Sequence, residues 1–147
     1  MIFVIVLIIL SLDQLTKYVL NSNFAPGESL PVIKNIFYLT LVHNRGAAFG
    51  ILKNQTQVFI LTSVFAIVLI CYSLKKHGRQ KVSVYILSLV FILAGAIGNL
   101  IDRVFFGYVI DFLDFRIWPV FNLADSAITI GAVILGYSFL KEKRLRS

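Results

Sequence analysis

Two aspartates, Asp111 and Asp125, are the residues whose type and spacing best suit them to chemistry. They lie 14 residues apart, one in a predicted loop and one at the apolar start of a predicted helix. Neither has an obvious basic partner at helical spacing. Two carboxylates brought together in a poorly solvated site cannot both ionise easily, so the pKa of one rises and the pair offers an acid and a base. Such a pair is suited to activating water.

Other reactive groups compete poorly with this pair. Ser63 and Ser126 have no lysine or histidine placed to activate them from the same face. The glycine-containing segment 45–50 lacks the lysine–serine ending of a phosphate-binding loop. His43 stands alone at the end of a predicted strand, so we expect no metal and no other cofactor.

The composition of the chain indicates a membrane protein. Hydrophobic residues make up 59% of the chain and charged residues 14%, against roughly 45–50% and about 25% in soluble domains. A soluble fold of 147 residues could not bury so much apolar surface. The net charge of +7 does not indicate nucleic acid, because the basic residues form short clusters beside apolar runs. The single cysteine, Cys71, excludes an internal disulfide and CxxC chemistry.

The apolar runs predict an all-α membrane protein with four transmembrane helices in a single domain, 1–147. The helices are expected at about 2–20, 58–74, 82–101 and 120–140. The first run lacks the basic start and cleavage site of a signal peptide, so we expect it to be retained. Residues 21–57, between the first two helices, contain a β-branched and aromatic run from Ile36 to Val42. A small extracytoplasmic β-sheet is therefore predicted in this region.

The third and fourth helices carry small residues one turn apart. The pairs are Ala94 with Gly98, Ala127 with Gly131, and Ala132 with Gly136. Such spacing lets helix backbones approach closely in lipid, so we expect these two helices to pack together.

Lysine and arginine counts in the loops predict the orientation. Segments 75–81 and 141–147 together hold eight basic residues, whereas residues 21–57 hold three and residues 103–119 hold two. Because basic residues favour the cytoplasmic side, both termini are expected in the cytoplasm.

On this topology, polar residues from three helices converge at the outer level of the membrane. These residues are Asp13, Lys17, Asn99, Asp102, Arg103, Asn122 and Asp125. A charge at the centre of a spanning helix costs roughly 2.5–3.5 kcal/mol on insertion scales. Placement near the interface lowers this cost but does not explain why three helices converge. The convergence indicates a functional site.

Structural roles remain open for three pairs, which are Asp13 with Lys17, Asp102 with Arg103, and Asn99 with Asn122. The first pair lies on one helical face and can neutralise itself. The second can form an ion pair at the interface, and the third can hydrogen-bond between helices. Asp114, flanked by Leu113 and Phe115, is expected to be solvated rather than catalytic.

Five segments, taken in order, resemble one family, the bacterial lipoprotein signal peptidases (signal peptidase II). They are DQLTK at 13–17, NRGAAF at 44–49, GAIGNLIDR at 95–103, VIDF at 109–112 and FNLAD at 121–125. Any one segment alone is weak, but the ordered set covers nearly the whole chain and is highly specific.

The resemblance implies an aspartic endopeptidase of the bacterial inner membrane, with its site on the extracytoplasmic side. It would cut prolipoproteins just before a diacylglyceryl-modified cysteine, with Asp111 and Asp125 as the catalytic pair. Substrate-binding or supporting roles would fall to Asp13, Lys17, Asn44, Gly46, Asn99, Asp102, Arg103 and Asn122. The expected partners are lipidated prolipoproteins and membrane lipid, with no nucleic acid, and the chain is expected to be a monomer.

Two alternatives come from other classes of protein. A small four-helix transporter would also hold membrane aspartates, in an ion pathway, but should place some near the midplane and show an inverted repeat. Here the aspartates crowd one face and no repeat is visible. A structural assembly subunit would have no reason to bring Asp111 and Asp125 together.

Overall fold

The computed structural model describes residues 2–46, 55–77 and 83–146. Within them the helices are α1 (Ile2–Asn23), α2 (Thr56–His77), α3 (Val84–Phe106) and α4 (Leu123–Arg146). The strands are β1 (Ser29–Ile33), β2 (Phe37–Asn44) and β3 (Val109–Asp114). All four helices are long and apolar enough to cross a membrane. The predicted fold class is confirmed.

The ends of α3 differ from the prediction for local reasons. The helix begins at Val84 because the side chain of Ser83 caps it, accepting a hydrogen bond from the Ile86 N–H (3.2 Å). It continues past residue 101 as far as Phe106. It ends at Gly107, whose left-handed φ of 78° is easy for glycine and whose N–H donates to the Arg103 carbonyl (3.1 Å).

α3 is the central helix and packs against α1, α2 and α4. Its contact with α4 depends on glycines at which the two backbones nearly touch. A Cβ atom on Gly131 would lie 2.7 Å from the Ser88 carbonyl oxygen, and one on Gly95 would collide with the Ala124 carbonyl oxygen. The small-residue prediction therefore holds for Gly131. It is wrong for Ala132 and Gly136, which are exposed on another face of α4.

The sheet is antiparallel, with the strand order β1-β2-β3. β1 and β2 come from the predicted surface region, whereas β3 lies between α3 and α4 and was expected to be a loop. In β3, Asp111 lies opposite Val42, and the register of β2 against β3 shifts between Leu39 and Val42. This pairing fixes Asp111 in a strand rather than a mobile connection.

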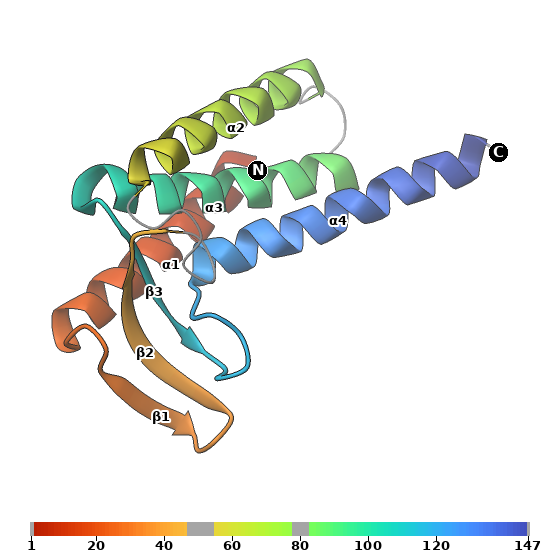
Figure 1. Cartoon of the computed structure of the whole chain (residues 1–147). Coiled ribbons are helices and arrows are strands. Elements are labelled where there is room, and N and C mark those ends of the chain that lie inside the picture. The colour runs from red at the N-terminus through yellow and green to blue at the C-terminus, as the bar shows by residue number, and fades with distance from the viewer. Residues whose placement is uncertain (1, 47–54, 78–82, 147) are drawn as a thin grey trace.

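The sheet extends from one end of the helix bundle (Figure 1). The chain leaves β3 through a short connection that leads directly to the start of α4. Leu113 in β3 also pairs with Phe121, just before α4. The strand that carries Asp111 is therefore held against the helix end that carries Asp125. Of the NRGAAF motif, Asn44, Arg45 and Gly46 are described, and residues 47–49 lie outside the described part.

Candidate active site

The buried ammonium group of Lys17 joins α1 to α3. Its Nζ lies 2.9 Å from an oxygen of Asp13 and 2.9 Å from an oxygen of Asp102, and it donates to Asn99 Oδ1 at 3.1 Å. The Lys17 side chain is 2% exposed, so its three donors must find protein partners, and these three contacts supply them. Asp13 and Lys17 do pair, but Asp102 is paired with Lys17 rather than with Arg103.

The remaining carboxylate oxygens of this cluster hold the other elements in place. Asp13 Oδ1 accepts the backbone N–H of Ala124 in the first turn of α4 (2.8 Å). Asp102 Oδ2 accepts the N–H of Ile110 in β3 (3.1 Å). The buried cluster therefore fixes both chain segments that carry the two candidate aspartates.

Asp125 is held by a reciprocal cap at the start of α4. Asn122 precedes the helix, and its side-chain oxygen accepts the Asp125 N–H (2.8 Å). In return the Asn122 N–H points at Asp125 Oδ2 (3.4 Å). This is the arrangement of a capping box, with asparagine and aspartate in place of the usual serine and glutamate. It orients the Asp125 carboxyl group through the helix start itself.

Three asparagines present N–H groups to the two aspartates. Asn122 Nδ2 donates to Asp111 Oδ1 (2.7 Å), and Asn44 Nδ2 donates to Asp111 Oδ2 (2.9 Å). Asn99 Nδ2 donates to Asp125 Oδ1 (2.7 Å). Both oxygens of Asp111 and one oxygen of Asp125 therefore accept a hydrogen bond from an asparagine side chain.

The orientation of each amide is fixed by its own oxygen. Asn99 Oδ1 faces the Lys17 ammonium, and Asn44 Oδ1 accepts the backbone N–H of Gly46 (2.9 Å). Asn122 Oδ1 accepts the backbone N–H of Asp125. An ammonium and a backbone N–H can only donate, so none of the three amides can turn its oxygen to the aspartates without losing a bond.

Asp111 and Asp125 are close enough to influence each other electrostatically, and both lie in a poorly solvated part of the protein. Asp111 is 1% exposed. Its burial, and then the charge of Asp125, raise the pKa of Asp111 to about 7, against the opposite effect of the Asn44 and Asn122 amides. The pKa of Asp111 is therefore raised, which is the direction expected for a carboxyl group in a poorly solvated site beside a second carboxyl group.

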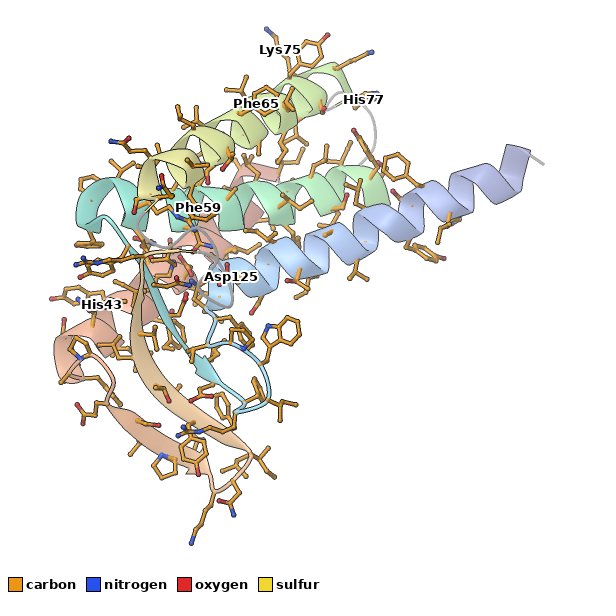
Figure 2. All side chains as sticks on the ribbon, viewed as in Figure 1. His43, Phe59, Phe65, Lys75, His77 and Asp125 are labelled. Atoms are coloured by element: carbon orange, nitrogen blue, oxygen red, sulfur yellow. The ribbon has the colours of Figure 1, made fainter. Side chains whose placement is uncertain are left out.

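A cavity of about 730 Å³ opens in front of the two aspartates. Its polar end is formed by Asn44, Gly46, Asn99, Arg103, Asp111 and Asp125. Arg103 reaches it with its guanidinium 5.0 Å from the Phe59 ring. Asp125 lies where the start of α4 meets the sheet (Figure 2). Lys17 and Asn122 do not line the cavity but contact Asn99, which does. Asp13 and Asp102 lie one step further back, bound to Lys17.

Asp114 was wrongly expected to be solvated. It is 5% exposed and accepts hydrogen bonds from Thr40 Oγ1 (2.7 Å) and from the Arg116 N–H (2.8 Å). The cause is β3, whose pairing with β2 brings the Asp114 side chain against Thr40.

His43 has structural contacts, since it hydrogen-bonds Asn21 (2.7 Å) and stacks on Tyr108. Among the described residues, no group of three or more His, Cys, Asp or Glu side chains is placed to hold a metal.

Sequence reasoning missed Gln14 and the segment 115–121. Gln14 Nε2 lies within hydrogen-bonding distance of Asp13, Asp102 and the Gly98 carbonyl (3.0–3.2 Å), so it closes the buried cluster. In the sequence, its position next to Asp13 was the one feature that could have indicated a role for Gln14 in the site. Phe115 and residues 117–121 line the apolar end of the cavity, and in the sequence their side chains resemble those of a lipid-facing run.

Membrane-crossing helices with a buried carboxyl pair at one end define an integral membrane protein with a paired-carboxyl site. Residues 5–141 match the family model for signal peptidase (SPase) II. The chain belongs to this family of bacterial membrane peptidases. Four apolar helices and this membership make it an inner-membrane protein, and the comparisons give no support to the transporter alternative.

The similarity extends over nearly the whole chain. A "Lipoprotein signal peptidase" of Moorella thermoacetica is 54% identical over 136 residues, which are 91% of this chain and 89% of that protein. One from Caldanaerobacter subterraneus subsp. tengcongensis is 50% identical over 147 residues, 99% and 100% of the two chains. A solved bacterial membrane enzyme superposes with a TM-score of 0.92 at 31% identity, covering 99% of this chain and 91% of that one.

The raised pKa of Asp111 predicts a pH-dependent stability. In the unfolded chain this carboxyl has its ordinary pKa of 3.8, and in the folded protein its pKa is about 7. Between these values the folded state binds more protons, so the contribution of Asp111 to stability falls as pH rises from about 4 to 7. An Asp111→Asn variant lacks this term. Its thermal midpoint in detergent, relative to the parent protein, should therefore rise across that range and level off above it; parallel curves would contradict the burial argument.

Proposed function

We propose that the chain removes signal peptides from diacylglyceryl-modified prolipoproteins, cutting just before the lipidated cysteine, with Asp111 and Asp125 as catalytic residues. The observation that carries the proposal is the pair itself. Two carboxyl groups from different elements face one cavity and share the Asn122 side chain, which donates to Asp111 and caps the helix of Asp125. Family membership supports the substrate class, because the named relatives are lipoprotein signal peptidases.

The chemistry needs one ionised and one protonated carboxyl group. The ionised group takes a proton from water, the water oxygen attacks the scissile carbonyl carbon, and the protonated group gives its proton to the carbonyl oxygen. In the second step the tetrahedral diol returns a proton, the amide nitrogen accepts one, and the C–N bond breaks. The products are the carboxyl end of the signal peptide and the free amine of the lipidated cysteine.

The surrounding residues divide into two groups in this proposal. Asn99 and Arg103 line the cavity, and Asn122 lies directly behind Asp111; these three would hold the carboxyl groups and the substrate backbone. Asp13, Lys17 and Asp102 act from behind, through Asn99 and the backbones of Ala124 and Ile110. Asn44, anchored on the Gly46 N–H, would hold Asp111 from the side of the sheet.

We further propose that the site faces the extracytoplasmic side and that both termini are cytoplasmic. The basic residues of the 75–81 and 141–147 segments support this orientation. Lys75 and His77 lie at the end of the bundle opposite to His43 and the sheet (Figure 2). A lipid-anchored cysteine keeps its scissile bond at the membrane surface, and a site at that depth gains effective concentration from the confinement.

The catalytic assignment is tested by three matched substitutions that each remove one carboxylate. Asp111→Asn and Asp125→Asn should each lower turnover by at least about 100-fold, the scale of a lost general acid or base. Asp114→Asn should keep most of the activity, because the Asp114 side chain is bonded to Thr40 and Arg116 and lies outside the described cavity lining. Turnover is followed by the mass of a lipidated prolipoprotein, with thermal unfolding as the check on folding. An Asp114→Asn enzyme as inactive as the other two would show that the pair is wrongly assigned.

The substrate class is tested with one prolipoprotein prepared with and without its diacylglyceryl group. Burying acyl methylenes contributes roughly 0.8 kcal/mol each, so the lipid should dominate binding, and the lipid-free form should be cleaved far more slowly in the same bilayer. Equal cleavage of both forms would refute recognition through the lipid. Absence of cleavage of the lipidated form by the purified protein would refute the proposed function.

The orientation is tested by labelling single cysteines in a Cys71→Ser background. A membrane-impermeant maleimide added to intact spheroplasts should label Lys34→Cys, which lies in the exposed connection between β1 and β2. It should label Lys76→Cys, exposed near the end of α2, only after the membrane is permeabilised. Labelling of both from the same side contradicts the topology.

A further inference from the structure

The cavity in front of the aspartates has a second, apolar end that the peptide chemistry does not use. This end is lined by Phe115, Ile117, Trp118, Pro119, Val120 and Phe121 of the β3–α4 connection, and by Thr129 and Ile130 of α4. We propose that it is an acyl-chain groove, which takes one fatty-acyl chain of the diacylglyceryl group while the scissile bond lies at the aspartates. This inference rests on the proposed function and locates the lipid within the same site.

The α4 side of the groove leads from the aspartate into the membrane. Asp125, Ser126, Thr129 and Ile130 all line the cavity. Positions three and four apart lie on one helical face, so these residues form a strip that begins at the carboxyl group and runs along the helix. The strip enters the apolar span from Leu123 to Lys141. A chain that starts at the cysteine sulfur beside the scissile bond has its direct route into the bilayer along this strip.

The far end of the strip is open to lipid. Ile130 lines the cavity, is also 47% exposed, and lies within the apolar span of α4. The groove is therefore not a closed pocket but a lateral opening, through which a chain can slide from the bilayer without leaving apolar surroundings. A ligand that stays anchored in the membrane can reach the aspartates by this path.

The wall opposite α4 is held in place by stacked aromatic rings. Phe115 and Phe121 lie with ring centroids 6.0 Å apart, and Phe115 also packs on Phe37 of β2 at 4.9 Å. Ile117 and Trp118 are 93% and 61% exposed at the tip of the connection. Tryptophan is favoured at the membrane–water interface, so the wall stands at the depth at which the acyl chains begin.

The size and chemistry of the groove favour an acyl chain over the signal-peptide helix. The whole cavity, about 730 Å³, is in the range of small-molecule sites, roughly 300–1,000 Å³, and is too small for a spanning helix. An extended peptide in the apolar end would also leave backbone N–H and C=O groups unpaired where little water enters. An acyl chain has no polar groups that need hydrogen bonds, so it can pack against the apolar lining of this end of the cavity.

The test fills the groove and varies the length of the chain that must enter it. The variant is Ile130→Trp, and the matched control is Val133→Trp, on the same helix, 68% exposed and outside the cavity lining. The substrates are one prolipoprotein carrying either two octanoyl or two palmitoyl chains, presented to the full-length protein in the same detergent. Because the bulk at position 130 displaces methylenes and not the peptide, KM should rise and kcat should change little.

For the palmitoyl substrate we expect KM of Ile130→Trp to rise about tenfold, which corresponds to roughly two methylenes losing their burial. The rise should be clearly smaller for the octanoyl substrate, and Val133→Trp should behave as the parent protein does. Thr129→Phe, which narrows the same groove from an exposed position, serves as a second variant and should show the same dependence on chain length.

Three results would contradict the proposal that this end of the cavity binds an acyl chain. An equal rise in KM for both chain lengths would mean that peptide, not lipid, occupies the apolar end. Equal effects of Ile130→Trp and Val133→Trp would mean that only the bilayer contact matters, and unchanged KM in both groove variants would mean that nothing binds there. In each of these cases the parent protein still cleaves lipidated substrate, so the proposed function stands. If the parent protein cleaves neither substrate, the proposed function itself fails.

Discussion

The structure depends on the need to satisfy one buried ammonium group. Lys17 is inaccessible to water and has three donors, and its partners come from its own helix and from α3. Removing one member of a buried ionic cluster leaves an uncompensated charge, which typically costs about 3–5 kcal/mol. Since Asp13 and Asp102 also bind the backbones of α4 and β3, this constraint fixes the relative positions of the segments that carry Asp111 and Asp125. Across the described residues, every buried side-chain nitrogen or oxygen has a hydrogen-bond partner.

Asn122 connects the buried cluster around Lys17 to the two aspartates. Its amide reaches Asp111, Asn99 and the Ile110 carbonyl, and its oxygen caps the helix that carries Asp125. One side chain thus caps the start of α4 and contacts both aspartates of the pair. The two aspartates are therefore held in place by hydrogen bonds at the end of β2, along β3 and at the start of α4.

The sequence predicted the elements with strong local signals. Four long apolar runs can only be spanning helices, and Asp111 and Asp125 stood out because no nearby side chain could neutralise them. The errors arose where the decisive partner was distant in sequence. β3 has only six residues and becomes a strand by pairing with β2, about seventy positions earlier, so neither the strand nor the burial of Asp114 could be read locally. For Asp102, an ion pair with adjacent Arg103 was one of the roles left open, whereas its partner in the structure, Lys17, lies on another helix.

The buried cluster also has a consequence for biogenesis. During synthesis α1 leaves the ribosome long before α3, so at first Lys17 has only Asp13, one helical turn away, as a charged neighbour. That pair is electrically neutral by itself, which lowers the barrier to inserting a helix with charges in its C-terminal half. The second carboxylate and the Asn99 oxygen arrive with α3 and displace the water that solvates the ammonium until then. Dehydration of Lys17 therefore belongs to a late step of assembly in the membrane. A nascent chain that has inserted only α1 and α2 has neither a sealed cluster nor a carboxyl pair.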